Sequence, residues 1–145
     1  HPEKSHVIPA LISKFDDAAK NNLKEVVCWG TGSPYREFLY VDDLADACKF
    51  VLENWRPNKK DIKYLNVGTG NDMKIKEIAE IIRKKCGFNG EIVWDHSKPD
   101  GTPKKQLDIS KIRSLGWEPK TSFDEGIDLT VTNYRYLKNQ KLLRE

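Results

Sequence analysis

Short apolar runs of the kind found in strands alternate along this chain with longer segments whose apolar residues recur at helical spacing. Strands are expected at residues 26–29, 37–41, 64–67 and 91–95, and helices at 5–21, 44–55, 75–86, 108–115 and from Ser122 onward. This alternation predicts a small mixed α/β domain in which helices cover a sheet. Some connections are too irregular for a complete doubly wound fold.

The ends of the predicted helices carry recognisable caps. Asp42 and Asp43 occupy the start of the clearest helix, where carboxylates accept hydrogen bonds from free backbone N–H groups and interact favourably with the helix dipole. Ser122 and Glu125 form a capping box at the last helix, and Gly87 is expected to close the helix at 75–86. Ser5 is the candidate N-cap of the first helix.

The length and charge of the chain exclude several classes of protein. Its 145 residues correspond to one domain, numbered 1–145, that can bury a substantial core. Lys and Arg number 25 against 22 acidic residues, so the net charge of +3 is too balanced for a strongly basic nucleic-acid-binding domain. No run approaches the ~20 apolar residues that span a bilayer.

The three cysteines, Cys28, Cys48 and Cys86, are odd in number and form no CxxC pair. This spacing argues against a disulfide framework and against a zinc site. Reduced thiols in or near a core are the expected state, which favours a cytoplasmic protein. No metal site is predicted, because capping already explains the pair Asp42 and Asp43.

Several catalytic motifs are incomplete. Two Gly-Thr-Gly turns, at 30–32 and 68–70, lack the third glycine of a dinucleotide-binding loop. Tyr134 and Lys138 form a YxxxK pair of the kind used by short-chain reductases, but this pair lies near the chain's end with no cofactor loop before it. We therefore assign neither turn and no YxxxK pair to catalysis.

Polar and aromatic residues in turns are the remaining candidates, and each has an ordinary structural alternative. Arg36 at a strand entrance suits bidentate binding of a phosphate, or it pairs with a neighbouring acid. The loop 97–105, with three lysines, is a ligand-binding loop or a solvated surface loop. Trp29 could stack on a base or pack in the core, and His6 could act as an acid or base or have a structural role.

The order of these segments resembles a known family. The strings SHVIPAL (5–11), WGTGSPYREFLYVDD (29–43), NVGTG (66–70), SKPDGTPKK (97–105) and LGW (115–117) are similar to those of the GDP-L-fucose synthases, within the extended short-chain dehydrogenases/reductases. REFLYVDD is typical of the wider group of nucleotide-sugar epimerases and dehydratases. SHVIPAL and SKPDGTPKK narrow the resemblance to the GDP-L-fucose synthases. The resemblance runs from about residue 1 to residue 137.

The resemblance implies a fold and a reaction. This family epimerises GDP-4-keto-6-deoxy-D-mannose at C3 and C5, then reduces C4 with NADPH to give GDP-L-fucose. The chain would be the carboxy-terminal, substrate-binding part, lacking most of the Rossmann domain. The family's cofactor loop, its Ser-Tyr-Lys set and its catalytic cysteine would precede residue 1, so NADP(H) would be bound mainly by that missing half.

The resemblance also assigns roles to single residues. His6 matches the histidine that acts as an acid in epimerisation and lies near the nicotinamide. The positions that line the GDP-sugar site in the family correspond here to Lys14, Trp29, Arg36, Asp100 and Lys105. Arg36 and Lys105 would face the diphosphate, and Lys14 stands where relatives carry arginine. The full-length enzyme is expected to be a homodimer, with neither nucleic acid nor membrane as a partner.

Two other functions remain open at this point. The chain could be the corresponding domain of another NDP-sugar epimerase or dehydratase, or a nucleotide-sugar-binding module without chemistry. Whether the chain is part of a GDP-L-fucose synthase or of another epimerase or dehydratase, we expect the 145 residues alone to have no reductase activity.

Overall fold

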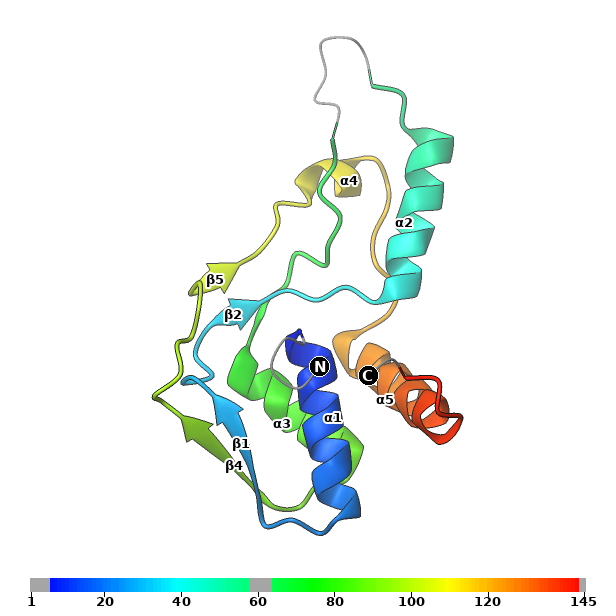
Figure 1. Ribbon diagram of the computed structural model, residues 1–145. Coiled ribbons are helices and arrows are strands. Elements are labelled where there is room, and N and C mark those ends of the chain that lie inside the picture. Colours follow the sequence, from blue (N-terminus) through cyan, green and yellow to red (C-terminus); the bar gives the residue numbers. More distant parts are fainter. Residues whose placement is uncertain (1–5, 58–63, 144–145) are drawn as a thin grey trace.

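The computed structural model of the protein describes residues 6–57 and 64–143. Its helices are α1 (Val7–Lys20), α2 (Val41–Asn54), α3 (Ile75–Cys86), α4 (Ser110–Ser114) and α5 (Phe123–Asn139). Its strands are β1 (Glu25–Trp29), β2 (Tyr35–Arg36), β3 (Met73–Lys74), β4 (Glu91–Asp95) and β5 (Lys104–Lys105). Figure 1 shows α2 and α4 together at the end of the molecule that lies away from β1 and β4. The mixed α/β architecture expected from the sequence is confirmed.

The strands form two small sheets. β1 pairs in parallel with β4, so that Trp29 lies opposite Asp95 where both strands end. β2 is the central strand of a second sheet, antiparallel to β3 and parallel to β5. This second sheet places Arg36 of β2 directly opposite Lys105 of β5. Each of its strands is only two residues long, so contacts outside the ladder must help to fix its register.

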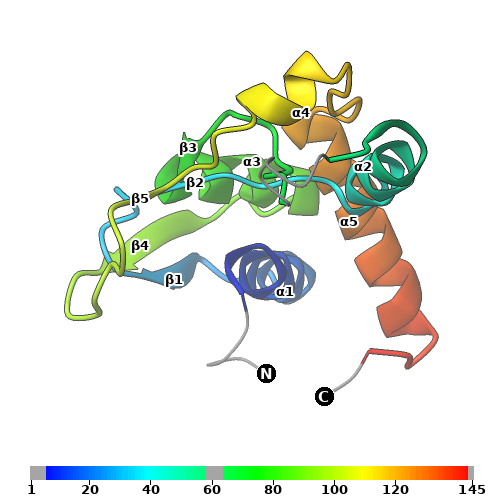
Figure 2. The same ribbon diagram turned by 90° about the horizontal axis from the view of Figure 1, so that it is seen from above.

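The main core lies between three helices and the β1–β4 pair. The buried side chains of α1 and α3 face each other, and α5 closes the cluster with Ile127 and Val131. Phe15 of α1 stacks on Phe88 with ring centroids 5.7 Å apart. Figure 2, seen from above, shows α1 and α3 beside the two strands and α5 crossing the far side of the helices. A smaller cluster joins α2 to α4 through Ala47, Ile112 and Trp117.

A buried carboxylate ties α1 to α5. Asp16 is fully buried, and its oxygens are bound by Lys20 at 2.8 Å, by Arg135 at 2.7 Å and by Lys138 at 3.4 Å. Arg135 also donates to the backbone oxygen of Cys86 at the end of α3. This network therefore fixes three helices against one another.

Two predicted strands are absent from the part of the chain that the structure describes. Residues 37–41 were expected to form a strand, but the strand is Tyr35–Arg36 and α2 already begins at Val41. Between them the carboxylate of Glu37 binds backbone N–H groups of another segment, which draws the chain out of the sheet. The segment 64–67 is apolar enough for a strand, yet no described neighbour pairs with it.

Other boundaries agree closely with expectation. The helix at 75–86 and the strand at 91–95 have their predicted limits, and Gly87 closes α3 with a left-handed φ of 74°. The first helix runs over 7–20 with His6 as its N-cap residue, while the predicted cap Ser5 lies outside the described residues. The predicted helix at 108–115 is shorter, at Ser110–Ser114. In the described part of the chain, no helix combines the length and apolar character that crossing a membrane requires.

Candidate functional site

An exposed tryptophan marks the point where β1 ends. Trp29 is the last residue of β1, so its side chain alternates away from the buried Cys28, and it is 52% exposed. The ammonium groups of Lys14 and Lys98 lie 5.8 and 5.5 Å from the centroid of its ring. Lys14 is held there by donating to the backbone oxygen of Val27 at 2.9 Å. The core position weighed for Trp29 is therefore wrong, and the indole is a surface platform with two cations beside it.

A pair of cations lies on the neighbouring sheet. Arg36 and Lys105 are cross-strand neighbours on β2 and β5, and such neighbours project to the same face. The Nη1 atom of Arg36 donates to the backbone oxygen of Tyr35 at 2.6 Å, which restrains the guanidinium. Among residues 6–57 and 64–143, neither cation has a carboxylate within ion-pair distance, whereas Lys104 next to them is paired with Asp72 at 3.1 Å. Two positive charges thus remain available to an anion.

The other face of this small sheet is also cationic. Lys74 and Lys104 lie 5.5 and 5.8 Å from the ring centroid of Tyr35, one on each neighbouring strand. Asp72 offsets part of this charge through Lys104. The unopposed pair is therefore on the face of Arg36 and Lys105.

Asp100 fastens the loop 97–103 to the turn after Trp29. Its Oδ1 accepts from the N–H of Thr31 at 2.6 Å, and its Oδ2 accepts from the Thr31 hydroxyl at 2.7 Å. These two hydrogen bonds hold the pKa of Asp100 below its usual value, so the group is ionised at neutral pH. Gly30 must be glycine here, because a Cβ atom would lie 2.3 Å from Asp100 Oδ1 and its φ is +80°. Asp100 has further acceptor lone pairs, but its first role in the structure is to hold the loop.

Glu37 plays a similar part at the other Gly-Thr-Gly turn. Its Oε1 accepts from the N–H groups of Thr69 at 2.6 Å and Gly70 at 2.7 Å, and its Oε2 accepts from the N–H of Leu107 at 2.8 Å. From the sequence, Glu37 was only the neighbouring acid with which Arg36 could pair. No local signal in the sequence could have revealed this role, because its partners lie 32, 33 and 70 positions away along the chain.

The two glycine turns do not form a dinucleotide cradle. A phosphate is bound by free backbone N–H groups, and here the N–H groups of Thr31, Thr69 and Gly70 already point at carboxylates of the same chain. As folded here, these two turns do not fit the phosphates of NADP. The sequence-based exclusion of these turns as a dinucleotide fingerprint therefore has a structural reason.

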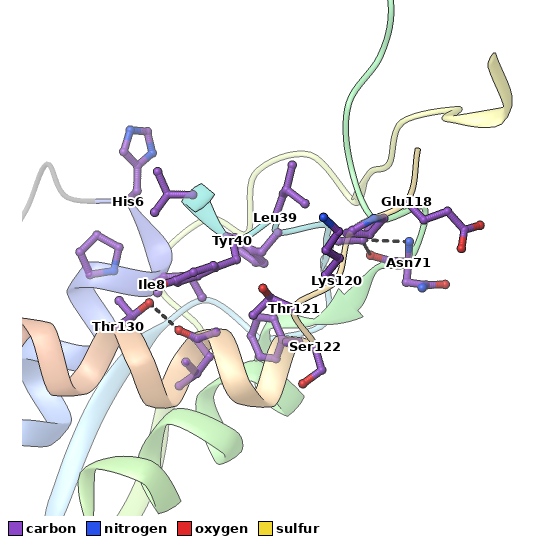
Figure 3. A pocket seen from close by; sticks show the side chains of 18 of the residues that line it. His6, Ile8, Leu39, Tyr40, Asn71, Glu118, Lys120, Thr121, Ser122 and Thr130 are labelled. Carbon is purple, nitrogen blue, oxygen red and sulfur yellow. Dashed lines mark hydrogen bonds between the residues drawn. The ribbon is translucent and has the colours of Figure 1, made fainter. Parts of the chain in front are cut away.

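His6 lies apart from the other predicted residues. It is exposed at the start of α1 and lines a cavity of about 830 Å³ together with the segment 38–41, the loop 118–122 and the first turns of α5. Figure 3 shows His6 at the edge of this cavity, with Tyr40 and Ile8 in its interior and Lys120 and Glu118 at the opposite end. Lys14, Trp29, Arg36, Asp100 and Lys105 do not line it. The structure thus places three predicted residues at strand ends, Trp29, Arg36 and Lys105. Lys14 of α1 lies beside Trp29, and the loop residue Asp100 binds the turn that follows it. His6 lies in a separate, mainly apolar hollow.

The remaining sequence candidates have structural roles. Lys138 contacts the Tyr134 ring at 5.2 Å, and its ammonium is bound by Asp16 and Asp17. Burial disfavours the charged form, but interactions with Asp17 and Tyr134 outweigh it and raise the pKa of Lys138. The YxxxK pair therefore belongs to the α1–α5 network. Asp43 accepts from the N–H of Thr121 at 2.9 Å. No group of three or more potential metal ligands occurs within the described ranges.

Comparison with known proteins identifies the family. Residues 1–68 match the model of the NAD dependent epimerase/dehydratase family. Over 134 residues the chain is 52% identical to a putative GDP-L-fucose synthase 2 of Arabidopsis thaliana, and over 149 residues it is 45% identical to the GDP-L-fucose synthase of Escherichia coli. The chain is therefore a homologue of the GDP-L-fucose synthases, and residues 1–68 match the NAD-dependent epimerase/dehydratase family. These matches cover 92% and 99% of the chain but only 40% and 46% of the relatives, so the chain spans less than half of their length.

Solved structures agree with this family. A GDP-L-fucose synthetase of Naegleria fowleri, also solved bound to NADP, superposes with a TM-score of 0.84 at 28% identity over 100% of the chain and 43–44% of its own. A GDP-6-OMe-4-keto-L-xylo-heptose reductase of Campylobacter jejuni gives a TM-score of 0.80 at 34% identity, covering 94% of this chain and 49% of its own. The fold is therefore that of part of an epimerase/reductase.

Proposed function

We propose that this chain is the GDP-sugar-binding portion of a GDP-L-fucose synthase, which converts GDP-4-keto-6-deoxy-D-mannose to GDP-L-fucose by 3,5-epimerisation and NADPH-dependent 4-reduction. The observation that carries the proposal is the register of β2 and β5, which sets Arg36 beside Lys105 without a carboxylate partner among the described residues. It is supported by identity of about half over nearly the whole chain to proteins of that name.

The chemistry of the pair matches a diphosphate. A guanidinium donates two parallel hydrogen bonds to phosphate oxygens, and an ammonium adds a compact point charge. Each charge-assisted hydrogen bond contributes about 1.5–3 kcal/mol when it is made away from bulk water. Trp29 offers an exposed aromatic face to the guanine base or the sugar, and Lys14 and Lys98 favour an anionic ligand at that face.

The reductive half of the reaction needs more than this chain. We propose that NADP(H) is bound mainly by the part of the family's length that these 145 residues do not cover, with His6 near the nicotinamide as the acid in epimerisation. The full-length protein is proposed to be a homodimer. Two buried cysteines and one exposed cysteine, all free, suit a reducing cytoplasmic compartment.

Calorimetric titration of the chain with GDP, UDP and dTDP tests this function. Saturable binding of GDP that falls at least about tenfold in Arg36→Ala supports it, because tenfold corresponds to the loss of one such hydrogen bond. Lys111→Ala, an exposed cation on α4, is the matched control and should bind as the unaltered chain does. A correctly folded chain that binds no nucleotide, and still binds none when the remaining length of the family protein is restored, contradicts the proposal.

The same titration distinguishes the two alternatives. Preference for UDP or dTDP favours another nucleotide-sugar epimerase or dehydratase, and a UDP-glucose 4-epimerase of Thermotoga maritima does share the fold at 29% identity, with a TM-score of 0.71. GDP binding without turnover in the restored full-length protein favours a nucleotide-sugar-binding module.

A further inference from the structure

We propose that Glu37 is the positioning residue of the anion site: its carboxylate clamps β5 in register with β2 and so holds Lys105 beside Arg36. This inference rests on the proposed function, because it assigns a role at the same site. It concerns a residue that touches no ligand and acts through two cations.

The clamp is needed because the ladder is short. β2 and β5 share only two residue pairs, Tyr35 with Lys104 and Arg36 with Lys105. A two-residue parallel pair has little stability of its own. Lys104 and Lys105 are both exposed, so apolar burial does not fix them either. The position of Lys105 must therefore come from what holds the segment on each side of it.

Both flanks of that segment are held by carboxylates. Upstream, Asp100 binds Thr31 through two hydrogen bonds. Downstream, the N–H of Leu107 donates to Glu37 Oε2 at 2.8 Å, two residues after Lys105. Asp100 lies five residues before Lys105 and Glu37 directly follows Arg36 along the chain, so the Glu37 contact is the shorter tether between the two cations.

The carboxylate is itself fixed from the other side. Its Oε1 accepts the N–H groups of Thr69 and Gly70, and the half-buried position of Glu37 limits competition from water. Gly68 packs so closely that a Cβ atom there would lie 2.3 Å from Glu37 Oε1. Three segments, at 37, 68–70 and 107, therefore converge on one side chain.

The side chains of Arg36 and Glu37 point to opposite faces and have different roles. Successive side chains of an extended segment point to opposite faces, so the carboxylate does not neutralise the guanidinium that precedes it. The carboxylate of Glu37 instead accepts hydrogen bonds from three backbone N–H groups, so the face of Arg36 and Lys105 stays positive. A residue placed this way raises affinity for an anion by ordering the cations.

The first test compares Glu37→Gln with Glu77→Gln in the same chain. Glutamine keeps the length but has one acceptor oxygen, so it cannot serve both Thr69 and Leu107. We expect amide hydrogen exchange to become at least about tenfold faster at Leu107 or at Thr69 and Gly70, and GDP affinity to fall about tenfold with the melting transition retained. Glu77 accepts a single backbone N–H from Lys74 at 3.0 Å, and its variant should leave GDP affinity unchanged.

The second test approaches the carboxylate from its neighbour. Gly68→Ala should displace Glu37 and reproduce the loss seen in Glu37→Ala, yet add little in a Glu37→Ala background, because the group it collides with is then gone. Lys105→Ala should likewise cost less affinity in that background. Each pair of substitutions, Gly68→Ala with Glu37→Ala and Lys105→Ala with Glu37→Ala, forms a double-mutant cycle. Additive losses of GDP affinity in both cycles, or wild-type GDP affinity in Glu37→Gln, would overturn the proposal.

Failure of the proposed function gives a different result. If the unaltered chain binds no GDP, the nuclear Overhauser contact between the β2 and β5 backbones still decides the role of Glu37. Its loss in Glu37→Ala, with the β1–β4 contacts intact, supports the clamp. Its persistence contradicts the clamp.

Discussion

At the scale of single residues, the fully buried carboxylate of Asp16 is bound by three cations. Burial alone would raise its pKa, but hydrogen bonds from Lys20 and Arg135 outweigh burial and hold the pKa below the ordinary value of 3.8. Because the pKa is lower in the folded state, the ionised group stabilises the fold above about pH 4. That stabilisation is lost as pH falls through the folded-state pKa.

Asp16→Asn should therefore lower the free energy of unfolding by about 2 kcal/mol at neutral pH, since it weakens charged hydrogen bonds among α1 and α5. The difference from the unaltered chain should shrink below pH 4. Urea unfolding at pH 7 and at pH 3 measures both values. Asp17→Asn is the control, because Asp17 is exposed and shares only Lys138. A difference that grows toward pH 3 would contradict the assignment.

The three cysteines differ in burial, and burial sets the pKa of a thiol. Burial raises the pKa of Cys86 to about 11 and also raises that of Cys28, whereas Cys48 is exposed. Since the thiolate is the reactive form, a thiol reagent at pH 7.5 should label one cysteine in the native chain and three in denaturant. Mass spectrometry should find the native label on Cys48. Labelling of Cys86 at a comparable rate would indicate that α3 opens readily from the core.

At the scale of elements, α5 depends on its first turn. Ser122 Oγ accepts from the N–H of Glu125 at 3.2 Å, the half of the predicted capping box that the structure shows. Ser122→Ala should cost about 1 kcal/mol of unfolding free energy. Thr132→Ala, on an exposed position of the same helix, should be neutral or slightly stabilising because alanine is the better helix former. Thermal unfolding of both variants checks the contrast.

Local pattern explains why some elements could be predicted and others could not. The helix at 75–86 has its own apolar period and its own glycine stop, so its limits follow from nearby residues alone. The segment 37–41 looks like a strand in isolation, but a side-chain contact with residues 69–70 and 107 decides its path. No local signal in a sequence reports a contact between positions more than 30 residues apart.

The candidate site divides along the same line. The resemblance picked out residues that the structure brings to neighbouring strand ends, such as Trp29, Arg36 and Lys105. Glu37 and Thr31 lie within the matching string 29–43, but the resemblance gave them no role in the site, and the structure shows them holding neighbouring segments in place. Nor did the resemblance separate His6 from the others, because only the fold shows that His6 and the segment 38–41 line a different cavity.

At the scale of the whole molecule, the chain covers about two fifths of the length of its curated relatives. We expect the 145 residues to oxidise no NADPH in the presence of GDP-4-keto-6-deoxy-D-mannose, because both Gly-Thr-Gly turns bind carboxylates in place of phosphates. Absorbance at 340 nm follows this reaction. Activity should appear when the remaining length of the family protein is supplied. Turnover by the chain alone would show that it holds a cofactor site of another kind.

The backbone N–H groups of Thr69, Gly70 and Leu107 form a carboxylate receptor, and the chain itself supplies the carboxylate, that of Glu37. Shortening Glu37 to alanine should leave this receptor vacant and able to accept a free carboxylate of similar size. Formate should then raise the melting temperature of the Glu37→Ala protein in a saturable way, while the unaltered chain should show only the general effect of added salt. Chloride at equal ionic strength provides the comparison. Equal responses to both salts would mean that the carboxylate site collapses when the Glu37 side chain is removed.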